Sequence, residues 1–208
     1  MLLSHSFFSL PILCEVQITM SSLIRYPLWV IALFVYLCTT SCVQAQVNAR
    51  DKHGETALMR AAKNGNFAHI KTLVATHADV NAKDKDGKTA LMDAAEAGSV
   101  RCIKLLIVAH ANVNATDDYE DTALIHAANA LCVNVLIAAG AKVNWQDSDG
   151  DSALTRAAYE GRADCVKALI AAGANVNIKT HYGGTAIGEA GLNHPDVVSL
   201  LKSAGEKE

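Results

Sequence analysis

The sequence predicts an all-α repeat protein, a solenoid of about five helix-turn-helix units with β-hairpin-like finger loops. The first observation is a heptapeptide, TALMRAA at residues 56–62, which recurs with small changes at 89–95, 122–128 and 152–158 and in a worn form at 185–190. The second is the spacing, since successive copies lie 33, 33, 30 and 33 residues apart. A period of this length is typical of stacked supersecondary units in which each repeat contacts only its neighbours.

Residues 84–116 show how one unit is built. Asp84 and Gly87 predict a turn, because aspartate binds nearby backbone N–H groups and glycine adopts a left-handed conformation. Thr89 is placed to cap a first helix that ends at Gly98, and a second helix with apolar residues at helical spacing is expected from about 99 to 109. Neither helix can bury its apolar face alone, so neighbouring copies must cover it.

This pattern resembles the ankyrin repeat. The family motif Asp-x-x-Gly-x-Thr-x-Leu-x-x-Ala-Ala-x-x-Gly, followed by an aliphatic helix and Gly-Ala-Asp-Val-Asn, is met almost completely from Asp51, Asp84 and Asp147. The resemblance covers roughly residues 47–205 and predicts a domain at 46–208, divided into repeats of about 51–83, 84–116, 117–146, 147–179 and 180–208. It implies a module that binds another protein, with projecting fingers and a concave groove lined by the first helices.

Departures from the family pattern carry structural predictions. His77 and His110 replace the glycine that closes the second helix, so each is expected to adopt a positive φ at some strain. Met59 stands where the family has histidine, which predicts the loss of one polar bond and a looser interface. In the third repeat Glu120 replaces the turn glycine, and residues 129–130 replace the five that elsewhere join the two helices. Either that inter-helix turn is tight or the first helix is cut short.

Two columns of residues are candidates for contacts with a partner. On the fingers, Tyr119, Trp145 and Tyr182 form an aromatic row, in which Trp145 is either an exposed anchor or lies across the next hairpin and only covers it. On the first helices, the groove column carries charges that are either a recognition stripe or a solvated face whose members compensate one another. The groove column consists of Arg60, Asp93, His126, Arg156 and Glu189.

The N-terminal 45 residues have the features of a signal peptide and lack the repeat pattern. No charge occurs between Arg25 and Arg50, and residues 28–37 form a continuous apolar run followed by small polar residues. This order predicts export across a bacterial inner membrane with cleavage before Gln46, and a start at Met20 would give a signal of ordinary length. The expected location is the periplasm or the exterior. The alternative is an uncleaved segment that anchors the chain to the inner membrane.

Charge and cysteine positions narrow the function further. Without residues 1–45 the chain has 17 basic and 20 acidic side chains, a net charge of −3 that gives no reason to expect nucleic acid. Cys102, Cys132 and Cys165 occupy one column of stacked repeats, too far apart for disulfides, and are expected to be buried. The alternative is a redox or ligand-binding protein that uses these thiols.

The sequence contains no motif of a known catalytic site. His77 and His110 share a column, yet the repeat spacing keeps them too far apart to bind one zinc ion. We therefore expect no enzyme activity, cofactor or metal, and a monomeric adaptor that binds another protein. The alternatives are a membrane-tethered stabiliser of one envelope enzyme and a secreted effector that binds a host protein.

Overall fold

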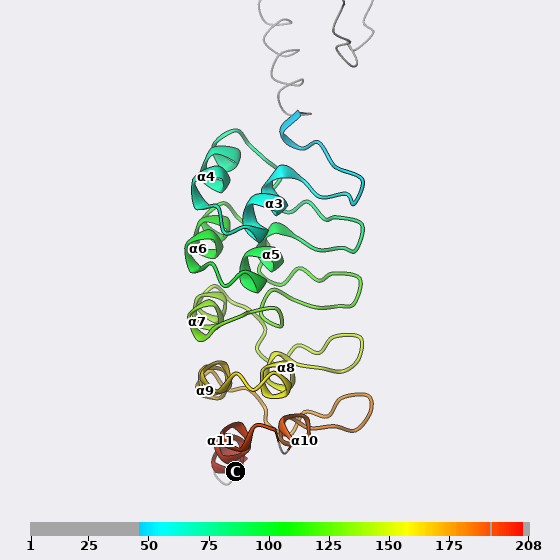
Figure 1. Ribbon diagram of the computed structural model, residues 1–208, viewed down its shortest axis with the longest axis vertical. Coiled ribbons are helices and arrows are strands. Elements are labelled where there is room, and N and C mark those ends of the chain that lie inside the picture. The colour runs from blue at the N-terminus through cyan, green and yellow to red at the C-terminus, as the bar shows by residue number, and fades with distance from the viewer. Residues whose placement is uncertain (1–45, 192, 206–208) are drawn as a thin grey trace, which may run out of the picture. The chain divides into compact units, whose positions relative to one another are not determined.

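The computed structural model describes residues 46–191 and 193–205, so the predicted signal peptide lies outside the described part of the chain. The helices are α3 (Ala57–Lys63), α4 (Phe67–Ala75), α5 (Ala90–Glu96), α6 (Val100–Val108), α7 (Ala130–Ala138), α8 (Ala153–Tyr159), α9 (Ala163–Ala171), α10 (Ala186–Ala190) and α11 (Pro195–Gly205). Figure 1 shows them stacked in two columns, with the connecting loops projecting to one side. The predicted all-α repeat solenoid is confirmed.

Each first helix begins at the threonine or serine of the heptapeptide. In the first repeat Thr56 Oγ1 accepts a hydrogen bond from Met59 N at 3.3 Å, and Met59 Sδ accepts one from Thr56 N at 3.4 Å. The prediction that Met59 removes a polar bond is therefore wrong, because the thioether takes that bond. In the fourth repeat Thr155 Oγ1 does the same for Ser152 N at 2.7 Å. Such reciprocal caps satisfy two backbone donors at the helix start.

The core runs along the stack between the two columns of helices. Its largest fully buried side chains include Leu58, Ile70, Leu91, Ile103, Leu106, Leu136, Leu154, Leu169 and Leu201. Cys102, Cys132 and Cys165 are buried in this core as free thiols, which confirms the prediction that they act as small apolar side chains.

The three buried thiols should resist labelling until the protein unfolds. Burial raises the pKa of the Cys132 and Cys165 thiols, which lowers the fraction of reactive thiolate. We expect a maleimide reagent to leave Cys102, Cys132 and Cys165 unmodified in the native chain and to modify all three in denaturant. Peptide mapping by mass spectrometry distinguishes them from Cys14, Cys38 and Cys42. Native modification of Cys132 would instead favour the redox alternative.

Two sets of polar contacts connect one repeat to the next. Four asparagine Oδ1 atoms accept a backbone N–H from the following repeat: Asn48 from Asp79 (2.8 Å), Asn81 from Asn112 (2.7 Å), Asn114 from Lys142 (2.9 Å) and Asn144 from Asn175 (2.8 Å). Neighbouring fingers are also joined by backbone bonds, for example from Ser148 N to Tyr119 O at 2.9 Å. Isolated antiparallel bridges close three of the fingers, Thr116 with Thr122, Gln146 with Ser152 and Lys179 with Thr185, as expected for hairpin-like loops.

The third repeat lacks a first helix. A single turn at residues 123–126 takes its place, and the chain then enters α7 directly. Ala128 N donates to Ala95 O at 3.1 Å, and Asn129 Nδ2 donates to Gly98 O at 3.1 Å, so this segment is held against the second repeat. Asn129 also caps α7, since its Oδ1 accepts Cys132 N at 2.9 Å. Of the two possibilities left open by the sequence, the first helix is cut short.

Within residues 46–191 and 193–205, three residues other than glycine adopt the left-handed conformation. They are His77 (φ 61°), His110 (φ 64°) and Glu120 (φ 63°), each at a position where the repeat pattern has glycine. The positive φ predicted for both histidines is confirmed. A positive φ in a residue other than glycine stores strain of about 1 kcal/mol, provided that the surrounding contacts hold it in place.

Replacing Glu120 with glycine should release that strain. We expect Glu120→Gly to raise the free energy of unfolding by about 0.5 to 1 kcal/mol, since glycine adopts φ near +60° without a steric penalty. The matched control is Glu120→Ala, which removes the same charge but keeps a Cβ atom. Urea denaturation of the two variants measures the difference, and equal stabilities would show that this turn is not strained.

Candidate binding surface

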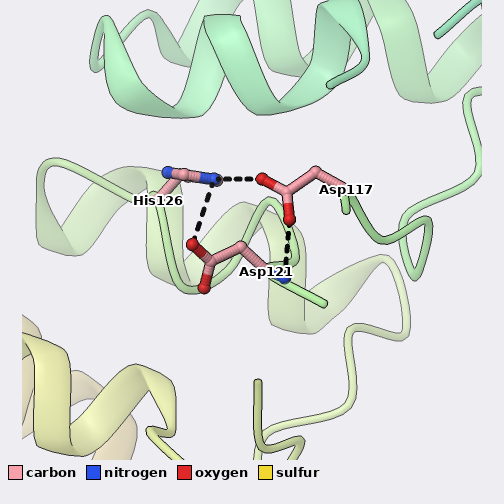
Figure 2. A group of neighbouring side chains, drawn as sticks. All are labelled: Asp117, Asp121 and His126. Atoms are coloured by element: carbon pink, nitrogen blue, oxygen red, sulfur yellow. Dashed lines mark hydrogen bonds and ion pairs between the residues drawn. The ribbon is translucent and has the colours of Figure 1, made fainter. Parts of the chain in front are cut away.

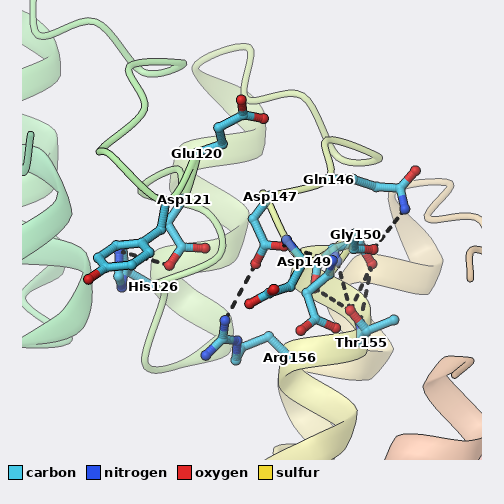
Figure 3. Close-up of polar contacts among 12 residues, drawn as sticks. Glu120, Asp121, His126, Gln146, Asp147, Asp149, Gly150, Thr155 and Arg156 are labelled. Atoms are coloured by element: carbon cyan, nitrogen blue, oxygen red, sulfur yellow. Dashed lines mark hydrogen bonds and ion pairs between the residues drawn. The ribbon is translucent and has the colours of Figure 1, made fainter. Parts of the chain in front are cut away.

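The groove-column cations pair with the turn aspartate of their own repeat. Arg60 and Arg156 form ion pairs with Asp51 (3.1 Å) and Asp147 (3.4 Å), and His126 Nε2 lies 3.5 Å from Asp117. In each case the basic residue follows the aspartate by nine positions, from the first helix in the first and fourth repeats and from the turn at residues 123–126 in the third. Figure 3 shows Asp147 directed toward Arg156. The other oxygen of Asp147 accepts Asp149 N and Asp151 N at 2.9 and 2.8 Å, so this carboxylate joins the finger to the helix. The geometry supports the interpretation in which groove charges compensate one another.

The second repeat departs from this scheme because Asp93 stands where the first, third and fourth repeats have a basic residue. Asp93 is only 7% exposed, and its carboxyl group has no hydrogen bond or ion pair among the described residues. Burial raises the pKa of Asp93 to about 7, against the opposing effect of Lys88 and Lys63. Asp93 is therefore a buried carboxyl group that titrates near neutral pH.

The third repeat gathers an imidazole and two carboxylates. His126 Nε2 lies 3.5 Å from Asp117 Oδ2 and 3.8 Å from Asp121 Oδ2 (Figure 2). Burial lowers the pKa of His126, assisted by Lys88, while Asp117 acts in the opposite direction. Burial also raises the pKa of Asp121, reinforced by Asp117 and by Asp147 of the next finger. The sequence analysis predicted His126 as a partner-binding residue but did not predict Asp117 or Asp121. The signal that could have found them is their spacing, nine and five residues before His126.

Asp117, Asp121 and His126 form the one group in the described part of the chain that could hold a metal ion. One ligand atom from each lies within 4.8 Å of the others. Asp117 Oδ1 is already occupied, since it accepts Tyr119 N and Asp121 N at 3.0 and 2.9 Å. Hydrogen bonds of this kind recur at Asp51, Asp84 and Asp147 in fingers without such a cluster. The turn of the finger is therefore sufficient to explain why an aspartate stands at position 117.

Trp145 is partly buried and packs against the core. Its Nε1 donates to Glu120 O at 2.9 Å, and Lys142 Nζ lies 5.0 Å from the ring centroid. Trp145 therefore covers a neighbouring finger, as one of the two sequence interpretations proposed. The finger is the one at the start of the third repeat, which contains Glu120, and not the next one along the chain.

Tyr119 and Tyr182 are the exposed members of the aromatic row. Their exposed fractions are 66% and 87%, and each lies at the tip of a finger, two residues after the first position of its turn. A tyrosine with its ring in solvent contributes nothing to the core, so these two residues are available to a partner. The structure thus separates them from Trp145, which the sequence had grouped with them.

A cavity opens where the third repeat lacks its helix. It has a volume of about 380 Å³ and lies between α5 and α8, lined by Glu96, Ile125, His126, Arg156 and Glu160. A second cavity of about 420 Å³, lined by Leu131, Ala163 and Asp164, shares Ala128 and Arg162 with the first. We call the two together the third-repeat notch. The sequence indicated the deletion but not the space that it leaves.

Comparison with known proteins identifies the family of this chain. The sequence model of the family described as "Ankyrin repeats (3 copies)" matches residues 30–84, 58–144 and 124–208. A search of curated proteins found no match to the chain. No helix within residues 46–191 and 193–205 is long and apolar enough to cross a membrane. The three family matches overlap and together cover all of the described residues, and the stacked helices and bonded fingers agree with them. The chain therefore belongs to the ankyrin-repeat family.

Proposed function

We propose that this chain is a non-catalytic adaptor that binds another protein through its fingers and groove. The observation that carries the proposal is the pair of exposed tyrosines, Tyr119 and Tyr182, on fingers whose backbones are bonded to their neighbours. Rigid aromatic side chains on a preorganised backbone lose little conformational entropy when they bind, which favours them as anchors. Ankyrin repeats are protein-interaction modules, and we propose the more specific role of an adaptor for this chain.

The test is affinity capture with the full-length chain as bait. We expect a protein retained by the wild type to be lost with a Tyr119→Ala, Tyr182→Ala double variant, since removing an anchor weakens binding by about 2 kcal/mol. The matched control is Tyr159→Ala, which removes an equally exposed tyrosine (64%) from the end of α8, away from the finger tips. Circular dichroism must first show that both variants are folded. Equal capture by wild type and double variant would move the contact to the groove around Arg60, Asp93, His126 and Arg156.

The proposed location of the adaptor is the periplasm or the exterior of a bacterial cell. This rests on the apolar run at residues 28–37 and the small residues before Gln46, which are typical of a cleaved signal. The mass of the chain recovered from cells would identify its N-terminus. A start at Gln46 is expected. A retained apolar segment together with dependence on detergent would instead favour the inner-membrane tether.

A further inference from the structure

Three aspartates in the described part of the chain are more than nine-tenths buried, namely Asp93, Asp117 and Asp147. Asp117 and Asp147 each accept two backbone N–H groups through Oδ1 and have a basic residue 3.5 or 3.4 Å from Oδ2. The carboxyl group of Asp93 has neither kind of contact among the described residues. A buried carboxylate without a partner destabilises a fold, and such groups are concentrated at functional sites.

The turn aspartate of the same repeat also lacks one of its usual contacts. Asp84 Oδ1 accepts Asp86 N and Lys88 N at 3.0 and 2.8 Å, whereas Asp84 Oδ2 has no partner among the described residues. In the first and fourth repeats the corresponding Oδ2 contacts the arginine nine residues later. In the second repeat that position is Asp93, whose pKa is raised by the charge of Asp84. The second repeat thus has two interacting carboxyl groups where those repeats have an ion pair.

Two nearby lysines do not supply the missing cation. Lys63 and Lys88 oppose the raised pKa of Asp93, but neither forms an ion pair with it. Lys63 Nζ instead contacts Glu55 Oε1 at 3.4 Å, and Lys88 Nζ contacts Glu96 Oε2 at 3.1 Å. With Asp93 ionised and the turn aspartate included, this group has four carboxylates and two ammonium groups, a net charge of −2. The complementary charge of a partner is therefore positive.

The carboxyl group of Asp93 is still open to solvent. Some side-chain atoms of the described residues are both fully enclosed and without a partner, and Asp121 Oδ1 is one of them, but neither oxygen of Asp93 is. An unpaired oxygen that is not enclosed touches solvent. Asp93 also belongs to the groove column, where it follows Arg60 and precedes His126. A side chain of a partner that lies along the groove can therefore reach this carboxyl group.

The third-repeat notch offers no comparable charge. Its lining includes two glutamates and two arginines, and each is already paired: Glu96 with Lys88, Glu160 with Arg162 and Arg156 with Asp147. The lining is therefore neutral, and charge does not select an occupant for the notch.

We propose that Asp84 and Asp93 bind an arginine side chain of the partner protein, which takes the place of the arginine that the first and fourth repeats supply themselves. A guanidinium group suits this site because its planar fork can donate to two carboxylates, and because it is less strongly hydrated than an ammonium group. This inference rests on the proposed function, since it names the chemistry of the partner that the adaptor binds. It adds a charged contact in the groove to the aromatic contacts at the finger tips.

The test is selection from a random peptide library displayed on phage, with the full-length chain immobilised at pH 8. We expect the enriched peptides to share an arginine. A synthetic peptide of that consensus should bind about tenfold more weakly when the arginine is changed to glutamine, because the charged hydrogen bonds are lost. Lysine in its place should weaken binding about threefold, since an ammonium group cannot form the fork.

Two variants of the chain locate the bound arginine. Asp93→Asn keeps the shape of the side chain and should weaken binding of the consensus peptide about tenfold at pH 8. Asp93→Arg gives the second repeat the residue of the first and fourth repeats, so it should pair with Asp84, remain folded and prevent binding. The matched control is Asp86→Asn, which removes an exposed carboxyl group from the same finger and should change binding less than about twofold. Circular dichroism checks that the three variants are folded.

The dependence on pH is a readout that a purely structural role of Asp93 would not reproduce. Burial raises the pKa of Asp93 to about 7, so about a tenth of it is ionised at pH 6 and about nine-tenths at pH 8. The difference in peptide affinity between wild type and Asp93→Asn should therefore fall from about tenfold at pH 8 to about twofold at pH 6. The charged groups around this site are Glu55 and Lys63 of the first repeat, Asp84, Lys88 and Glu96 of the second, and Asp117 and His126 of the third, which interact with Lys88. Comparing the two proteins at each pH removes the contributions of these groups.

The outcomes separate the inference from the proposed function. A consensus without arginine, no enriched consensus at all, or arginine peptides bound equally by wild type and Asp93→Asn at pH 8 would overturn the assignment of Asp93. A protein captured through Tyr119 and Tyr182 would still support the adaptor in that case. Arginine peptides that lose affinity in both Asp93 variants, and keep it in Asp86→Asn, support the assignment.

Discussion

Leu136→Ala should lower the free energy of unfolding by about 3 kcal/mol and disrupt the cooperativity of the whole stack. Leu136 is 0% exposed and belongs to α7, which is the one helix that the described part of the third repeat contributes. Truncating a buried leucine loses its transfer free energy and leaves a cavity, at a cost of about 2 to 5 kcal/mol. Because repeats are stabilised chiefly by their neighbours, damage at the centre uncouples the two ends.

Urea denaturation followed by far-UV circular dichroism measures both effects. We expect a lower midpoint and a broader transition, with a smaller slope, because the two ends unfold separately. The control is Leu131→Ala in the same helix, where 66% exposure predicts a change below about 0.5 kcal/mol. A sharp single transition in Leu136→Ala would mean that the third repeat does not couple its neighbours.

Asp93→Asn should stabilise the protein at alkaline pH by about 2 kcal/mol and much less at acidic pH. The pKa of Asp93 is about 7 in the folded chain, compared with about 3.9 for an unperturbed aspartate. Between these values the folded state binds more protons than the unfolded state, so the stability of the wild type falls as the pH rises toward 7. Above 7 the buried charge is fully present, and asparagine removes it.

The measurement is the difference in unfolding free energy between Asp93→Asn and wild type across this pH range. Using the difference removes the contributions of other groups that titrate in both proteins. The control is Asp86→Asn on the finger of the same repeat, which removes an exposed carboxyl group instead of a buried one. A pH-independent effect of Asp93→Asn would mean that Asp93 is ionised throughout, held by Lys63 and Lys88.

The ion pairs between finger and helix affect how binding variants are interpreted. Arg60 and Arg156 hold Asp51 and Asp147, and those aspartates organise the finger turns. Alanine at either arginine would alter the finger as well as the groove. Loss of partner binding in such a variant would therefore not by itself place the partner in the groove. Tyr119 and Tyr182 are cleaner probes, because their rings are exposed.

Much of the fold follows from local patterns in the sequence. The period of about 33 residues predicts stacked units, and the threonine or serine that opens the heptapeptide predicts where the first helix begins in every repeat but the third. The left-handed conformations of His77 and His110 also follow, since the chain has a positive φ at that point of each of the first four repeats. The cysteine column predicts burial because equivalent positions face the same core. These properties depend on a residue's place within its own repeat.

The binding surface depends on contacts between repeats, which the sequence alone did not determine. The sequence offered two positions for Trp145, and only the stacking of the third and fourth repeats places its indole on Glu120 O. The sequence left open whether the charges at Arg60, His126 and Arg156 form a recognition stripe or compensate one another, and the fold brings the turn aspartate of the same repeat beside each of them. The deletion at residues 129–130 became a cavity because α7 packs against the second repeat and leaves the first-helix layer open. Side-chain direction and empty space are set by packing between units, and a pattern within one unit carries no information about either.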